Sequence, residues 1–342
     1  MQTQLFKINS NNDNDKISRA GEILKNGGVV GIPTETVYGL AANALDENAV
    51  AKIFRAKGRP SDNPLIVHIA DFDDIYKLAS DVPKEAVLLA NKFWPGPLTI
   101  ILKSLDIVPK SVSAGLGTVA IRMPSHEVAR QIIRSAGVPL AAPSANLSGT
   151  PSPTTAQHVM DDLNGRIDAV VDGGACSVGL ESTVITLCDF PPKLLRPGKI
   201  TPAELACVLG EIEIDNSVFD KLDDNATPSS PGMKYKHYSP KANVIIIRGE
   251  LKNFIDFVSL NKKSGVMALC FDGEENNMPV PSLCFGQKSN AQEQAHNLFN
   301  ALREIDSLGA STVYVRSPKS DGIGLAVFNR LLRAAEFEVI DV

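Results

Sequence analysis

The 342 residues are 44% hydrophobic and 21% charged, with a formal net charge of −5. These values describe an ordinary globular protein with room for two domains, and the negative charge excludes a protein whose main role is to grip a nucleic-acid backbone. The five cysteines form no CxxC pair, so we expect free thiols in a reducing cytoplasm. No apolar run approaches the roughly 20 residues of a membrane span, and the N-terminus lacks the apolar core of a signal peptide. A cytoplasmic protein without membrane contact is expected.

Strand and helix signals alternate through residues 1–210, which predicts an α/β domain. The apolar run at 28–32 predicts a buried strand that ends at Pro33, because proline lacks the N–H that strand pairing uses. Asp46 is expected to cap a helix that ends near Gly58. Further strands are predicted over residues 65–69, 98–102, 118–123, 138–142, 169–172, 183–187 and 194–196.

Capping residues predict where the other helices of this half begin. Two helices with acidic caps are expected after residue 69, the second opening at Asp81, and Ser125 is expected to cap the next one. Thr154 or Thr155 is expected to cap a further helix. The last signal is the strongest: the run 201–204, Thr-Pro-Ala-Glu, is a capping box with proline at the first helical position.

The apolar periodicity disappears between residues 211 and 240, where Asp, Asn, Pro, Ser and Gly crowd together as in a linker. A second strand–helix alternation over 241–342 predicts a smaller α/β domain with a mostly parallel sheet. Its strands are predicted at 244–247, 266–271, 312–315 and the C-terminal end, and its helices from 250, over 291–308 and over 325–335.

Polar side chains gather where the first predicted strand and helix end. The strand delivers Thr34, Glu35 and Thr36 to one place, and the helix end brings Lys57 and Arg59. These cations suit a helix C-terminus in any protein, but the glycine and proline between and after them fix the backbone, which favours anion binding. Hydroxyls, a carboxylate and two cations from separate elements suit a polar, phosphate-bearing substrate.

Two charged or titratable residues lie inside predicted strands. His68 is either a satisfied core histidine or a site residue, and the sequence favours neither. Arg122 ends a buried strand, and because an unpaired buried arginine costs several kcal/mol, it should meet a carboxylate. That carboxylate is either a structural Asp or Glu or the α-carboxylate of a substrate.

Small and hydroxyl-bearing residues follow further strands, in the runs 143–149 and 179–183, and Arg196 ends another strand. Such loops let a ligand approach the backbone and offer hydroxyls and N–H groups to phosphate or ribose, although turns and helix caps use the same residues. The chain holds no GxSxG elbow, HExxH, Walker A motif or complete GxGxxG. With these motifs absent, we expect a site that positions its substrates and stabilises their charge. Such a site suits phosphoryl or nucleotidyl transfer.

Together these motifs resemble the threonylcarbamoyl-AMP synthase family, the YrdC-like proteins, in its longer two-domain form. The match is dense from Gly27 to Gly198 and continues through the linker run 230–240, Ser-Pro-Gly-Met-Lys-Tyr-Lys-His-Tyr-Ser-Pro. The resemblance implies a twisted mixed sheet with flanking helices, followed by a smaller Rossmann-like α/β domain. Thr186 departs from the pattern, because many relatives carry an acidic residue there, and no metal ligand is assigned.

The implied reaction joins L-threonine, bicarbonate and ATP, with Mg²⁺ accompanying the ATP, to give L-threonylcarbamoyl-AMP and pyrophosphate. The product would pass to a complex that transfers the threonylcarbamoyl group to tRNA. By the same resemblance, Lys57 and Arg59 would be the catalytic cations. The residues implied to hold threonine are Thr36, His68, Arg122, Ala142 and Ser182. The residues implied to hold ATP are Arg59, Asn63, Thr118, Ser144, Ser152, Arg196 and Tyr238.

The linker run 231–238 is rich in aromatic and basic residues, so we expect it to be a lid over the pocket rather than a tether. Two other functions are compatible with parts of the sequence. A double-stranded RNA-binding or tRNA-handling module, with possible weak RNA contact, would use the basic residues at 52–59, although the overall acidity disfavours it. A carbamoyltransferase acting on carbamoyl phosphate would normally carry zinc-binding cysteine clusters, and none are present.

Overall fold

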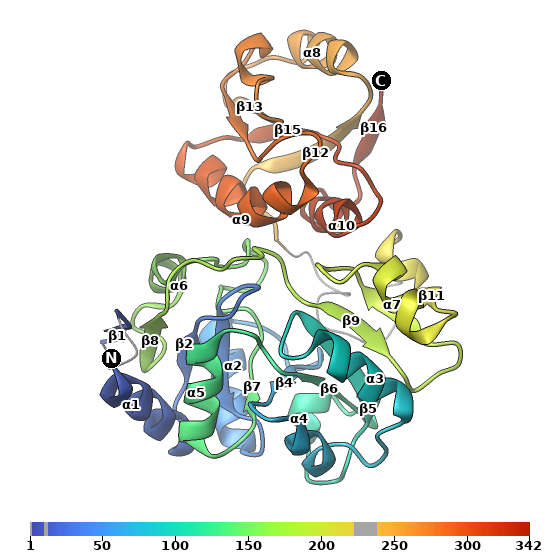
Figure 1. The fold of residues 1–342 in the computed structure, drawn as a ribbon. Coiled ribbons are helices and arrows are strands. Elements are labelled where there is room, and N and C mark those ends of the chain that lie inside the picture. Colours follow the sequence, from blue (N-terminus) through green and yellow to red (C-terminus); the bar gives the residue numbers. More distant parts are fainter. Residues whose placement is uncertain (1, 10–12, 222–237) are drawn as a thin grey trace.

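The chain folds around two separate sheets, an 11-stranded mixed sheet and a five-stranded parallel sheet, in a computed structural model that describes residues 2–9, 13–221 and 238–342. Figure 1 shows the larger body below and the smaller one above, with helices on both. The mixed sheet and the second, parallel sheet confirm the predicted α/β fold class. Within the described residues, none of the helices has the length and apolar character needed to cross a membrane.

The first domain places its strands in the order β1-β8-β2-β3-β7-β4-β6-β5-β9-β10-β11. Parallel and antiparallel pairs alternate irregularly, with β4 parallel to β6 and β5 antiparallel to it. Its strands are β1 Gln4–Lys7, β2 Val30–Ile32, β3 Gly39–Asn43, β4 Ile66–His68, β5 Leu98–Lys103, β6 Thr118–Arg122, β7 Leu140–Ala141, β8 Ala169–Asp172, β9 Thr183–Thr186, β10 Lys193–Arg196 and β11 Glu213–Ile214. Its helices are α1 Asn14–Lys25, α2 Glu47–Lys57, η1 Phe72–Lys77, α3 Lys84–Phe93, α4 Lys110–Ser113, α5 Glu127–Ala136, α6 Ala156–Leu163, α7 Pro202–Leu209 and η2 Asn216–Val218.

Local capping chemistry sets several of these helix ends. The Asp46 carboxylate accepts from two N–H groups at the start of α2, and the left-handed Gly58 ends that helix, both as predicted. Thr155 caps α6, and the predicted capping box opens α7. Two predicted caps are wrong. α5 begins after His126 rather than at Ser125, and α3 begins after Pro83, so the Asp81 side chain makes no cap.

The second domain has the strand order β14-β13-β15-β12-β16, and every pair in it is parallel. Its elements are β12 Asn243–Arg248, α8 Leu251–Leu260, β13 Val266–Cys270, η3 Glu275–Asn277, β14 Ser282–Cys284, α9 Ala291–Ser307, β15 Thr312–Arg316, α10 Gly324–Ala334 and β16 Val339–Asp341. Helices α9 and α10 cover the face of this sheet that looks toward the first domain, and α8 covers the other (Figure 1). The predicted strands and helices are confirmed, and the sequence reading missed only the short, half-buried β14 and the 3₁₀ turn η3.

The range 211–240, predicted as a linker, begins with ordered structure. β11 pairs in parallel with β10, and Val218 of η2 is buried. The rest of the range, residues 222–237, lies outside the described residues, and with it most of the predicted lid. Tyr238 is the first residue described after it, and its side chain is buried.

Candidate active site

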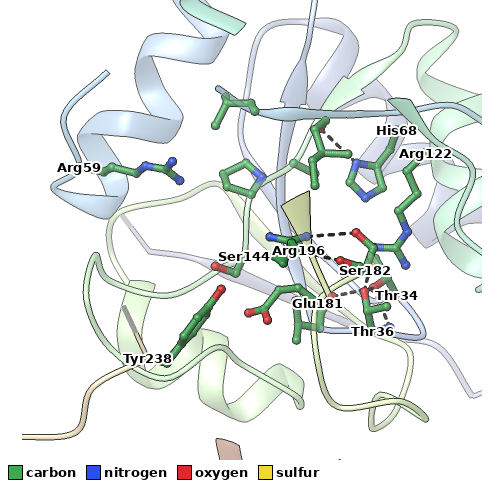
Figure 2. A pocket seen from close by; sticks show the side chains of 16 residues that line it. Thr34, Thr36, Arg59, His68, Arg122, Ser144, Glu181, Ser182, Arg196 and Tyr238 are labelled. Atoms are coloured by element: carbon green, nitrogen blue, oxygen red, sulfur yellow. Dashed lines mark hydrogen bonds between the residues drawn. The ribbon is translucent and has the colours of Figure 1, made fainter. Parts of the chain in front are cut away.

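One pocket of the first domain collects polar side chains from strand ends that are far apart in the sequence (Figure 2). It holds about 600 Å³ of empty space, a volume that includes open solvent. The lining residues are Thr34, Thr36, Val37, Gly39, Arg59, Leu65, Ile66, His68, Arg122, Ala142, Pro143, Ser144, Glu181, Ser182, Arg196 and Tyr238. The three arginines that the sequence singled out therefore face one cavity.

Strand register brings the predicted residues together. His68 and Arg122 are direct partners on the parallel strands β4 and β6. β2 pairs with β3, and Pro33 after β2 turns the chain so that Thr34 and Thr36 reach the cavity. β7 stops at Ala141, which leaves the following small residues to line the wall.

Arg122 has the carboxylate partner that its burial required. Its Nη2 lies 2.7 Å from Oε1 of Glu35, and its Nη1 donates to Oγ1 of Thr36 at 2.8 Å. Burial opposes ionisation of Glu35, but the Arg122 charge and the hydrogen bonds from Arg122 and the backbone together lower the pKa of this carboxyl below its ordinary value. Of the two alternatives left by the sequence, the structure therefore supplies a structural glutamate, while Arg122 itself still lines the cavity.

His68 is neutral in the folded protein. Its ring is buried beside Arg122, and burial together with that positive charge lowers the pKa of His68 to about 3. A neutral imidazole next to a guanidinium can accept or donate a hydrogen bond without adding charge to the pocket.

Arg196 and Ser182 form a second fixed group. Arg196 donates from Nε to the Ser182 carbonyl at 3.0 Å and from Nη2 to its Oγ at 3.1 Å. The Ser182 hydroxyl also lies 2.8 Å from Oγ1 of Thr99. Burial lowers the pKa of Arg196 to about 10, so it keeps its charge at neutral pH.

Four predicted ligand residues do not line the pocket: Lys57, Asn63, Thr118 and Ser152. Lys57, predicted as a catalytic cation, donates from its Nζ to the carbonyls of Ser144 and, at 2.7 Å, Asn146. It lies underneath the Ser144 wall and fixes that wall from behind. Burial, followed by the nearby Arg59 charge, lowers the pKa of Lys57. Asn63 and Ser152 are fully buried.

Glu181 is the pocket residue to which sequence reasoning gave no role, although it stands in the noticed run 179–183. Its carboxylate accepts from the hydroxyl of Ser152 and, at 2.8 Å, from Nε of Arg330 in the second domain. Burial would raise the pKa of Glu181, but the charges of Arg330 and Arg196 lower it below its ordinary value. The Arg330 contact had no sequence signal, because nothing in its own helix marks it.

Among the described residues, no group of three or more His, Cys, Asp or Glu side chains is placed to hold a metal ion. The two carboxylates near the cavity, Glu35 and Glu181, are each paired with an arginine. This donor set does not fit a resident metal.

Comparison with known proteins defines the class. Residues 22–198 match the Sua5_yciO_yrdC family model, described as telomere recombination, and residues 200–336 match the model of the threonylcarbamoyl-AMP synthase C-terminal domain. With the pocket above, these matches define a two-domain enzyme of the nucleotidyltransferase kind.

The chain belongs to the threonylcarbamoyl-AMP synthase family. It is 46% identical to the threonylcarbamoyl-AMP synthase of Pyrococcus abyssi, over 96% of each chain. It is 45% identical to that of Bacillus subtilis, over 97% of this chain and 96% of the relative. The crystal structure of P. abyssi Sua5 complexed with L-threonine matches with a TM-score of 0.92 and 44% identity, over 99% of this chain and all of that one.

Proposed function

We propose that this enzyme makes L-threonylcarbamoyl-AMP and pyrophosphate from L-threonine, bicarbonate and ATP. The observation that carries the proposal is the pocket itself, where Arg59, Arg122 and Arg196 face one cavity together with hydroxyls and a neutral histidine. The names of the similar proteins, one of which was crystallised with L-threonine, support the same reaction.

Threonine would occupy the side of the pocket around Arg122 (Figure 2). The guanidinium is held by Glu35 and Thr36, so it meets a substrate carboxylate already oriented. His68, Ala142 and Ser182 complete this side. The neutral state of His68 is compatible with the positive charge of Arg122 beside it.

ATP would occupy the side formed by Arg59, Ser144, Arg196 and Tyr238. Asn63, Thr118 and Ser152 would then act from behind the lining, as Lys57 does through the Ser144 carbonyl. Mg²⁺ would enter bound to ATP, as part of the substrate, because the described residues offer no ligand cluster of their own.

The chemistry requires positioning rather than a protein nucleophile. Bicarbonate converts the threonine amine to a carbamate with loss of water, a carbamate oxygen attacks the α-phosphorus of ATP, and the bond to the pyrophosphate oxygen breaks. Both reactants are anions, so fixed positive groups must offset their repulsion. Arg59, Arg122 and Arg196 would supply them from strand and helix ends.

The product would serve tRNA modification through a separate transfer complex. We place the reaction in the cytoplasm, which agrees with five cysteines that are all free thiols. The competing possibility is an RNA-handling module without turnover.

Pyrophosphate release tests the proposal. The purified chain with MgATP should release pyrophosphate only when both L-threonine and bicarbonate are present, and Arg122→Gln should raise the threonine KM at least tenfold. Tight, salt-sensitive binding of duplex RNA with no threonine-dependent pyrophosphate would instead support the RNA-handling module.

A further inference from the structure

The second domain contacts the wall of the first domain's pocket through one buried arginine. Arg330, on α10, is fully buried. It donates from Nε to Oε2 of Glu181 at 2.8 Å, from Nη2 to the Glu181 carbonyl at 3.3 Å and from Nη1 to the Pro197 carbonyl at 2.9 Å. Its guanidinium also lies 5.7 Å from the ring centre of Tyr238. One side chain thus holds three places in the pocket wall or directly beside it.

Those contacts converge on one side of the cavity. Glu181 also accepts from Ser152, and Pro197 directly follows Arg196. Arg303 of α9 reinforces the same region, because its Nη2 donates to the Pro151 carbonyl at 2.6 Å and pairs with Asp162 at 2.7 Å. Two helices of the second domain therefore contact the surroundings of Ser152, α9 through the Pro151 carbonyl and α10 through Glu181.

The packing between the domains is continuous with the core of the second one. Val37 and Leu180, which flank the cavity in the first domain, belong to the same buried cluster as α9, α10 and the second sheet. A side chain on Gly179 would place its Cβ 2.5 Å from Cα of His296 on α9. Because the two domains pack so closely, a displacement of α9 or α10 must also displace the pocket wall.

We infer that Arg330 is a positioning residue for the nucleotide side of the pocket, which it fixes through Glu181, the Pro197 carbonyl and the Tyr238 ring. The inference rests on the proposed function for which side is the nucleotide side. It gives the second domain a definite role, because α10 supports from outside the wall that would receive ATP, whereas Arg122 on the threonine side is held by Glu35 and Thr36 of the first domain.

The test compares two buried arginines of α10 by measuring binding. Arg330→Gln removes the contacts to Glu181 and Pro197. Arg333→Gln is the matched control, because Arg333 is also buried but donates, at 2.6 Å, to the carbonyl of Ser217, which is not among the residues that line the cavity. Calorimetry would give the dissociation constants of MgATP and, separately, of L-threonine for the full-length variants, and thermal unfolding would give their stability.

We expect Arg330→Gln to weaken MgATP binding at least tenfold while threonine binding changes less than threefold. Arg333→Gln should leave both constants within threefold, even where it lowers the unfolding temperature as much. Arg330→Lys, which keeps the charge but not the forked donors, should lie between wild type and Arg330→Gln. The double variant Arg330→Gln/Glu181→Gln should lose no more MgATP affinity than the weaker-binding of the two single variants. Both substitutions break the same contact between Arg330 and Glu181.

Equal losses of MgATP affinity in the Arg330 and Arg333 variants, or equal losses of MgATP and threonine binding in Arg330→Gln, would overturn the inference. Because binding rather than turnover is measured, these outcomes are distinct from a failure of the proposed reaction, which would show as absent pyrophosphate release by the wild type. If Arg330→Gln does not fold, the same comparison between Arg330→Lys and Arg333→Lys decides the question.

Discussion

At the scale of single residues, the pocket depends on charges that are buried behind its surface. Glu35 holds Arg122, and Lys57 holds the carbonyls under Ser144. Such groups are expensive to bury, and they are kept only when every donor finds an acceptor. Positioning chemistry needs this rigidity, because a wall that shifts by about 1 Å can cost about two orders of magnitude in rate.

Lys57→Met should destabilise the protein by about 2–6 kcal/mol, because two buried carbonyls lose their donor and each such loss costs about 1–3 kcal/mol. It should also weaken ATP binding, since the Ser144 wall is released. Lys52→Met is the control on the same helix, where an exposed lysine donates to the single carbonyl of Gly27 at 2.6 Å. Urea unfolding measures the difference. Equal losses of unfolding free energy in both variants would show that the carbonyl contacts of Lys57 do not account for its contribution to stability.

His68 predicts a particular pH dependence of stability. Its pKa is about 3 in the folded protein and near 6.5 when unfolded. Between these values the unfolded state binds a proton that the folded state does not. The free energy of unfolding therefore falls as the pH drops below about 6.5, by up to about 1.4 kcal/mol per pH unit for this group.

His68→Gln should accordingly reduce the slope of the free energy of unfolding against pH between pH 6.5 and 4. The reduction should correspond to at most one proton. Denaturant unfolding at a series of pH values measures the slope. His158, whose pKa is lowered to about 4 mainly by burial, contributes to the same slope in both proteins, so only the difference is informative. An unchanged slope in the variant would contradict a neutral, buried His68.

At the scale of elements, the structure shows what local sequence determines. Caps and turns carry their own chemistry, so Asp46, Gly58 and the box at Thr201 set helix ends as predicted. Buried strands with branched residues, such as β12 and β15, were likewise recognisable. The short strands β11 and β14 were not, because two or three residues become a strand only when a neighbour pairs with them.

The candidate site divides in the same way. Residues at strand ends, such as Arg122 and Arg196, were found because a charge closing an apolar run stands out. Arg330 was not, since its place depends on how α10 docks on another domain. The sequence also did not show that Lys57 contacts backbone carbonyls, because spacing alone does not show whether a cation at a helix end contacts a ligand or a carbonyl.

The close contact between the loop at Gly179 and α9 gives a prediction at this scale. Gly179→Ala faces both a left-handed backbone, with φ at 85°, and a collision with α9. Gly174→Ala is the matched control, with φ at 91° and nothing within 4 Å of the added Cβ. Backbone strain should cost each about 1–2 kcal/mol, and overpacking should cost Gly179→Ala about 1–3 kcal/mol more. Thermal unfolding measures both, and equal losses would mean that the domains separate easily at this loop.

At the scale of the whole molecule, the two domains form one binding unit. The first supplies a mixed sheet whose strand ends converge on the cavity, and the second supports the surroundings of the cavity through contacts from α9 and α10. The family membership and the fold agree with this arrangement. What joins the sequence, the fold and the proposed reaction is that two anions, the threonine carbamate and ATP, would share one positively lined space.

Competition by a stable sulfamoyl analogue of L-threonylcarbamoyl-AMP tests that shared space most directly. The analogue carries both the threonyl and the adenosine parts, so a single molecule should fill both sides of the pocket. Calorimetry on the protein saturated with the analogue should show no remaining binding of L-threonine and none of MgATP. If either substrate still binds with its original affinity, the two do not meet in one pocket, and the account is wrong.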